Sequence, residues 1–217
     1  MRFNLSSLIL SIAVIITHAY LTNSTTQAEQ LNSAQQAKTT ETQFNLSTVD
    51  LINGLQTGGY IIYMRHGMTN HEQKDNTQDF SDCTRQRNLS NSGREQLELI
   101  ANAIRELKIP IGDVLSSPYC RAKHTADITF GKFTVESKLQ FSISKNLEES
   151  QRLGEQLKQM MYQASTENSN AVFVGHTSNL RDGLGIWPKP EGVIVVFKKQ
   201  QGKLLFLGMI KPNEWPN

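Results

Sequence analysis

The sequence predicts an α/β fold in which a mainly parallel sheet is covered by helices on both faces, a three-layer sandwich that ends in an antiparallel hairpin. Short runs rich in β-branched and aromatic residues, such as 60–64 and 171–175, have the length and composition of buried strands. Helical segments separate these runs, and that alternation favours a parallel sheet with two covered faces. Two last apolar runs, 192–198 and 203–211, flank Gln201-Gly202 and predict the hairpin.

The helices are predicted from apolar residues at helical spacing. In the longest ones, Leu97 and Ile104 or Leu153 and Leu157 fall on a single face. In chain order, we expect helix 48–56, strand 60–64, helix 91–107, strand 113–116, helix 119–129, strand 133–136, helix 147–164, strand 171–175, helix 178–184 and the two hairpin strands.

Length and charge narrow the functional classes. A chain of 217 residues with ordinary apolar content fits one domain with a sizeable core. The formal net charge is +2, with no basic stripe, so no nucleic-acid partner is expected.

The N-terminal segment has the pattern of a secretory signal peptide. Arg2 precedes an apolar stretch over 5–16, and small residues follow at Ala19 and Ala28, after either of which cleavage is expected. We therefore predict a signal peptide over 1–28, a polar linker over 29–44 and a folded domain over 45–217. The mature protein would be periplasmic or secreted, without stable membrane insertion. An uncleaved anchor is the alternative.

Three predicted strands end in residues that suit phosphate chemistry. Arg65 and His66 follow the first strand, and His176 follows the run 171–175. Arg121 lies in the first turn of the helix that begins after Ser116-Ser117-Pro118, where free amides also favour an anion. Ligands of open α/β sheets bind beyond the carboxyl ends of the strands. Arginine matches phosphate geometry, and neutral histidine is a nucleophile near neutral pH.

These motifs resemble those of the histidine phosphatase superfamily, which includes the cofactor-dependent phosphoglycerate mutases. The resemblance covers roughly residues 58 to 210 and rests on Arg65-His66-Gly67, Leu89-Ser90 with Gly93-Arg94 and Gln96, Ser116-Ser117-Pro118 with Arg121-Ala122 and Thr125-Ala126, and Gly175-His176. It implies a phosphoglycerate mutase-like fold and a phosphohistidine intermediate on His66. Arg65, Arg121 and His176 would hold the phosphoryl oxygens, without a metal or cofactor.

Further substrate contacts are expected around this centre. Asn70 and Arg87 belong to the long polar segment that comes after the nucleophile, and Thr177 comes directly after the second histidine. Thr177 or Ser178 is expected to cap the next helix, whose free amides could face phosphate. Arg87 and Arg85 would either contact a second anionic group or, the expected case, pair with Asp79 and Asp82 on the surface.

The chain departs from the superfamily pattern at the general acid. Many members carry a Glu in a Leu-x-Glu pattern after the third strand, whereas this chain has Leu139-Gln140-Phe141. An alkoxide leaving group needs a proton, and a nitrogen or phosphate leaving group needs it less. The pattern is similar to phosphohistidine phosphatases and lipopolysaccharide-core heptose phosphatases. The remaining candidate acids are expected to be surface charges: Asp75, Asp79, Glu148, Asp182 and Glu191.

Two other features leave alternatives open. Cys83 and Cys120 would form a disulfide in an oxidising compartment, tying the polar segment to the helix that carries Arg121, or would remain two free cysteines. A metal site at His66, His71 and the nearby aspartates is disfavoured, because no His-x-x-x-His spacing occurs.

The sequence therefore predicts an exported phosphomonoester or phosphoramidate hydrolase. Its partner would be a phosphorylated small molecule, glycan or protein side chain. A pseudoenzyme that binds phosphorylated ligands is the alternative from another class. A phosphomutase is disfavoured, because mutases of this superfamily keep the general acid. Trp187 is expected at the surface, either packed there or at the rim of the pocket.

Overall fold

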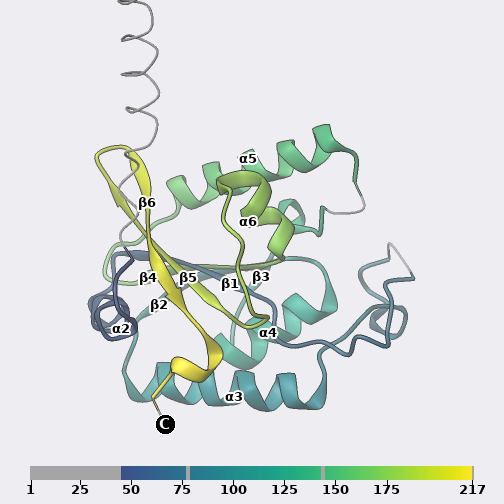
Figure 1. The fold of residues 1–217 in the computed structure, drawn as a ribbon, viewed down its shortest axis with the longest axis horizontal. Helices are drawn as coiled ribbons and strands as arrows, with labels where there is room; N and C mark the ends of the chain where they lie inside the picture. The colour runs from purple at the N-terminus through teal and green to yellow at the C-terminus, as the bar shows by residue number, and fades with distance from the viewer. Residues whose placement is uncertain (1–44, 77–78, 143–144, 217) are drawn as a thin grey trace, which may run out of the picture. The chain divides into compact units, whose positions relative to one another are not determined.

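The computed structural model describes residues 45–76, 79–142 and 145–216. The predicted signal peptide and linker, 1–44, lie outside these residues. The described part has six strands and five α-helices, an α/β fold as predicted (Figure 1). The helices are α2 (Thr48–Thr57), α3 (Asn91–Glu106), α4 (Cys120–Phe130), α5 (Leu147–Gln163) and α6 (Thr177–Leu184). The strands are β1 (Tyr60–Arg65), β2 (Ile111–Ser116), β3 (Thr134–Val135), β4 (Asn170–Gly175), β5 (Ile194–Gln200) and β6 (Lys203–Ile210).

The sheet has the order β3-β2-β4-β1-β5-β6. The pairings β2–β3, β2–β4 and β1–β4 are parallel, whereas β5 pairs antiparallel with both β1 and β6. The mainly parallel sheet and the C-terminal hairpin are thus confirmed. Because Arg65 lies opposite Gly175 and Ser116 opposite Val174, the ends of β1, β4 and β2 meet at one edge.

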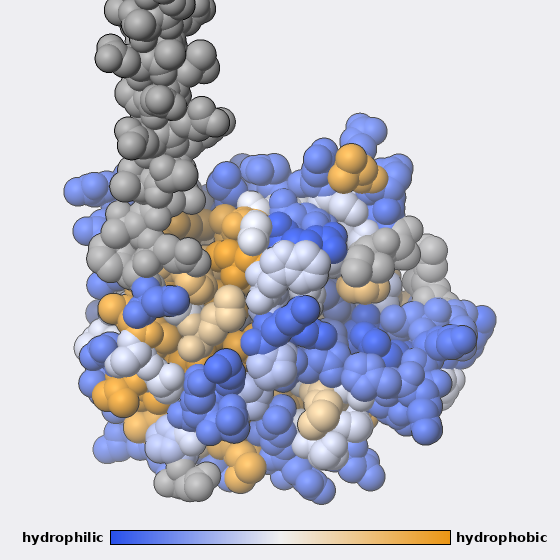
Figure 2. Space-filling model, viewed as in Figure 1, coloured by the Kyte–Doolittle hydropathy of each residue, from blue (hydrophilic) through white to orange (hydrophobic). Residues whose placement is uncertain are grey.

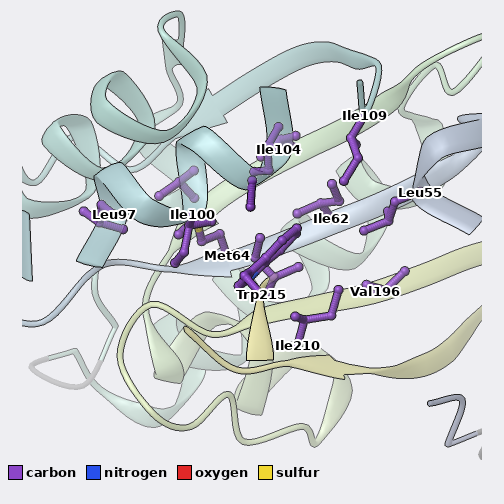
Figure 3. Packing of buried hydrophobic residues seen from close by; sticks show 14 of the residues in the cluster. Leu55, Ile62, Met64, Leu97, Ile100, Ile104, Ile109, Val196, Ile210 and Trp215 are labelled. Atoms are coloured by element: carbon purple, nitrogen blue, oxygen red, sulfur yellow. The ribbon is translucent and has the colours of Figure 1, made fainter. Parts of the chain in front are cut away.

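Two hydrophobic clusters hold the layers together. On one face of the sheet, α2, α3 and α4 pack against β1, β4 and β5 through a cluster that includes Leu55, Met64 and Ile100 (Figure 3). On the other face, α5 and α6 cover Tyr63 and Phe173 (Figure 1). Alternate residues of β1 face opposite clusters, which explains why the whole strand reads as apolar.

The element bounds differ from the predicted ones at several ends. β2 begins at Ile111, two residues early, and β3 is only two residues long. Helix α6 begins at Thr177, with His176 as its N-cap residue. The predicted cap by Thr177 or Ser178 is therefore wrong, and the Ser178 hydroxyl instead accepts a hydrogen bond from the backbone N–H of Ser142.

The surface divides into a polar and a more apolar part. In Figure 2 blue covers the side that holds the segment between β1 and α3, and orange gathers over the β5–β6 hairpin and α2. In the described part of the chain, no helix has the length and apolar content needed to cross a bilayer.

Candidate active site

The strand ends bring two histidines and two arginines together. The rings of His66 and His176 lie edge to face with their centroids 5.3 Å apart. Both are buried, and Arg121 has no exposed surface at all. The backbone explains this convergence, because the N–H of His66 donates to Gly175 O (3.0 Å) and the N–H of Ser117 donates to Val174 O (2.9 Å).

The environment of His66 fixes its tautomer and its charge. Its Nδ1 lies 2.9 Å from the carbonyl oxygen of Gly67, which only accepts, so Nδ1 carries the hydrogen and Nε2 keeps a free lone pair. Burial and then the positive charge of Arg121 hold the pKa of His66 well below its usual range. The imidazole is therefore neutral at physiological pH. The N–H of Gly67 is anchored on the Thr125 hydroxyl of α4 (2.9 Å), which fixes the loop that carries this histidine.

His176 is held from two sides. The Tyr63 hydroxyl donates to its backbone oxygen (2.7 Å), and its Nε2 lies 2.8 Å from Ser117 Oγ. Gly175 permits this packing, because a Cβ there would lie 2.5 Å from the Tyr63 hydroxyl. Desolvation, followed by the positive charge of Arg121, lowers the pKa of His176 well below its usual range. Its Nδ1 is left without a protein partner.

Each arginine is bound to one carboxylate. Arg121 Nη1 donates to Asp75 Oδ1 (2.9 Å) and Oδ2 (3.2 Å), and Arg65 Nη2 donates to Glu191 Oε1 (3.1 Å). Burial lowers the pKa of both guanidinium groups, and the paired carboxylates oppose that effect. Both side chains therefore remain cationic.

Several side-chain nitrogens of this cluster, most of them arginine donors, are buried without a hydrogen-bond partner in the protein. They are Arg65 Nε, Arg87 Nε, Arg121 Nε, Arg121 Nη2 and His176 Nδ1. Among the described residues, these are all of the unpartnered buried side-chain nitrogens apart from Trp215 Nε1. A buried donor without an acceptor is unfavourable by about 1–3 kcal/mol, so such a group of donors indicates a binding site for an anion.

The model of the histidine phosphatase superfamily (branch 1) matches residues 61–164, a range that contains Arg65, His66 and Arg121. This match confirms the superfamily resemblance over residues 61–164. No curated protein is detectably similar to it in sequence.

Solved phosphatase structures of low sequence identity resemble this fold. One is a mutant of the phosphoserine phosphatase from Entamoeba histolytica in complex with phosphoserine. It is 16% identical to this chain with a TM-score of 0.55, and the match covers 71% of this chain and 98% of the phosphatase. The α-ribazole phosphatase from Shigella flexneri is 12% identical with a TM-score of 0.54, covering 70% and 96%. The protein histidine phosphatase SixA, bound to tungstate, is 18% identical with a TM-score of 0.47, covering 71% and 97%.

The superfamily motif residues lie together. Of the additional candidates predicted from sequence, some lie near the site and one is engaged elsewhere. Arg87 is half-buried, and its charge lowers the pKa of both histidines, so it lies in the cation cluster. Thr177 directly follows His176 at the start of α6 and is half-buried. Asn70 uses its side-chain oxygen within its own turn, where it accepts the N–H of Glu72 (3.0 Å).

Surface pairing of Arg85 and Arg87 with Asp79 and Asp82 is the expectation from sequence. The Arg85 guanidinium donates to Asn76 O (2.8 Å), and its charge also helps to lower the pKa of Asp79, in keeping with that expectation. The Asp82 carboxylate accepts from Thr84. For Arg87 the expectation is wrong, because its side chain is half-buried and its charge acts on both histidines.

The expectation that the candidate acids are surface charges is wrong for Glu191 and Asp182, whereas Asp75 is exposed but paired. The Glu191 side chain is 9% exposed and accepts from Arg65 and from the Thr69 N–H (3.0 Å). The Asp182 side chain is 11% exposed and is paired with Arg181. Asp75 lies against Arg121. No local pattern signals the pairs of Asp75 and Glu191, because their partners lie 46 and 126 positions away.

The cysteines form a disulfide. Cys83 and Cys120 are joined across a separation of 37 residues, with their Cα atoms 5.7 Å apart. The bond ties the polar segment to the first residue of α4, next to Arg121, as expected for the disulfide alternative. The segment containing Asp75 and Arg87 is thereby restrained over the anion site.

Proposed function

We propose that this protein is a phosphohydrolase that acts on phosphomonoesters or phosphoramidates through a phosphohistidine on His66. The observation that carries the proposal is the set of buried donors without partners around a neutral imidazole. A phosphoryl group between His66 and His176 would accept hydrogen bonds from these donors. Charge that builds on its oxygens would meet cations that are already fixed in place.

The proposed reaction depends on the tautomer of His66. Nε2 attacks phosphorus, a P–N bond forms, and the bond to the leaving group breaks with its electron pair on the departing atom. Water then attacks phosphorus, the P–N bond breaks, and inorganic phosphate is released. Arg65, Arg87 and Arg121 act by position and charge throughout, and His176 acts by position.

The test is to trap the intermediate. The 45–217 domain is incubated with acetyl phosphate, quenched at alkaline pH, where phosphohistidine survives, and mapped by mass spectrometry. We expect phosphate on His66, and no labelling or turnover in His66→Ala. The matched control is His71→Gln, because the His71 side chain is 70% exposed. Retained phosphate binding without any labelled intermediate or turnover would instead identify a ligand-binding pseudoenzyme.

We also propose that the protein is exported, with a leader over 1–28 and a mature chain that is periplasmic or secreted. The charged and apolar pattern of the leader supports this. The disulfide is a second support, because such bonds persist in oxidising compartments. N-terminal sequencing of the protein from fractionated cells should find it outside the cytoplasm, beginning after Ala19 or Ala28. A chain that retains Met1 in the cytoplasm would contradict export.

A further inference from the structure

Three aromatic side chains surround the part of the site formed by Arg121 and His176. The ring of Tyr119 lies 5.1 Å from that of His176 and 4.5 Å from the Arg121 guanidinium carbon. Phe141 lies 5.2 Å from the His176 ring and 5.6 Å from the Arg121 guanidinium carbon. Phe80 extends the group, 4.9 Å from Tyr119. We call Phe80, Tyr119 and Phe141 the aromatic wall.

The aromatic wall lies apart from the two hydrophobic clusters, although Tyr119 itself is buried. Its residues belong to neither cluster that packs on the faces of the sheet. Phe80 and Phe141 are half-buried, so their rings keep a surface that a ligand can reach. Phe141 contacts both Arg121 and His176 and remains open to solvent, and Phe80 adds a second accessible ring beside Tyr119. This arrangement has the properties of a subsite for an apolar, planar group.

The nearest carboxylates do not present a proton to that subsite. Asp75 Oδ1 accepts from Arg121 and from the N–H of Arg87, and Oδ2 also accepts from Arg121. Both Glu191 oxygens accept from Thr69, and Oε1 also accepts from Arg65. A leaving group at this wall must therefore depart without help from these carboxylates. That requirement favours leaving atoms whose electron pair is delocalised into a ring.

We propose that the aromatic wall selects substrates whose phosphoryl group is bonded directly to an atom of a planar aromatic system, a phenolic oxygen or an imidazole nitrogen. This inference rests on the phosphohydrolase function proposed above. The ring would stack on Phe141 and Phe80 while His66 attacks phosphorus. The P–O or P–N electron pair stays on the leaving atom, solvent supplies the proton, and water later releases phosphate from His66.

The experiment compares kcat/KM for paired substrates that share the bond being broken. Phenyl phosphate is paired with trifluoroethyl phosphate, and phosphohistidine with phosphoramidate. Wild type should prefer the ring-bearing member of each pair by at least tenfold. Phe141→Leu should lower kcat/KM for that member about two- to tenfold and leave the other member unchanged. Tyr162→Leu, a change at a side chain of α5 that is 46% exposed, is the control.

The outcomes separate the two proposals. Labelling of His66 by acetyl phosphate in wild type and in Phe141→Leu shows that the proposed function stands and that the variant folds. If wild type and Phe141→Leu are both labelled but wild type does not prefer the ring-bearing substrate in either pair, the aromatic wall does not select substrate. If the preference is present but survives both Phe141→Leu and Phe80→Leu, the wall is also not its cause. The two pairs distinguish an oxygen from a nitrogen leaving atom. Absence of any phosphoenzyme overturns the proposed function itself.

Discussion

The two arginines of the anion site are paired in different ways. Arg65 lies at the end of a strand, and its partner Glu191 is also fixed by the N–H and hydroxyl of Thr69. Arg121 is fully buried on α4, but its partner Asp75 belongs to the irregular segment between β1 and α3 and is 26% exposed. The Glu191 side chain is only 9% exposed.

The difference indicates separate roles for the two pairs. A carboxylate with several donors of its own keeps its place when an anion binds, so the Glu191 pair orients Arg65. The Asp75 carboxylate instead occupies Nη1 of the arginine that has the most unpartnered donors, Nε and Nη2. A phosphoryl group would therefore compete with Asp75 for Arg121, whereas Glu191 would remain in place.

The largest effect is expected from the arginines themselves. Arg121→Lys removes a planar fork with two unpartnered buried donors, and lysine reproduces neither its geometry nor its reach. We expect kcat/KM to fall by about 100-fold or more. Arg65→Lys should cost less, because Arg65 has a single unpartnered donor, Nε. Steady-state kinetics on one aryl phosphate checks the order, and a larger loss for Arg65→Lys would contradict the comparison.

Removal of the disulfide tests how strongly this bond restrains the segment that carries Asp75. Cys83→Ser combined with Cys120→Ser frees a 37-residue connection, so the free energy of unfolding should fall by about 2–4 kcal/mol. The change lies beside Arg121, so KM should rise more than kcat falls. Urea denaturation with and without reductant measures the stability. Equal unfolding midpoints for wild type and the double variant would show that the bond does not restrain this segment.

Stability should also depend on pH through the two buried histidines. Their pKa values are lowered in the folded state, so below about pH 6.5 the unfolded chain binds protons that the folded chain does not. Stability is therefore complete above that pH and falls as the pH decreases, by about 1.4 kcal/mol per pH unit for each histidine. Urea titrations between about pH 6.5 and 5 should show a shallower slope for His66→Gln. An unchanged slope would mean that His66 is not buried in its neutral form.

How much of the fold and the site can be predicted from the sequence depends on how far apart the interacting residues lie along the chain. β1 and the Arg65-His66 pair are readable because local composition identifies the strand and the order of motifs along the chain identifies the residues at its end. The convergence of His176 and Arg121 on His66 is a consequence of parallel topology. Sequence could not place Tyr63 against the His176 carbonyl, or Asp75 against Arg121, because such pairs depend on side-chain directions across distant segments.

The smallest expected effect, that of Asp75→Asn, best distinguishes the Arg121–Asp75 pair from the Arg65–Glu191 pair. Asp75→Asn keeps the shape of the side chain and removes the charge that competes with phosphate for Arg121. We expect KM, and the inhibition constant of inorganic phosphate, to fall about three- to fivefold, in keeping with the modest strength of a partly exposed ion pair. Glu191→Gln is the matched control, and it should not tighten phosphate binding, since that carboxylate is held by Thr69 as well.

A different result would assign Asp75 another role. If kcat falls in Asp75→Asn on trifluoroethyl phosphate but not on phenyl phosphate, then Asp75 supplies the proton that an alkoxide needs. Competition for Arg121 predicts the opposite pattern, with the change in KM and with the same size for both leaving groups. The two substrates together therefore decide between two roles for Asp75: competition with the phosphoryl group for Arg121, or donation of a proton to the leaving group.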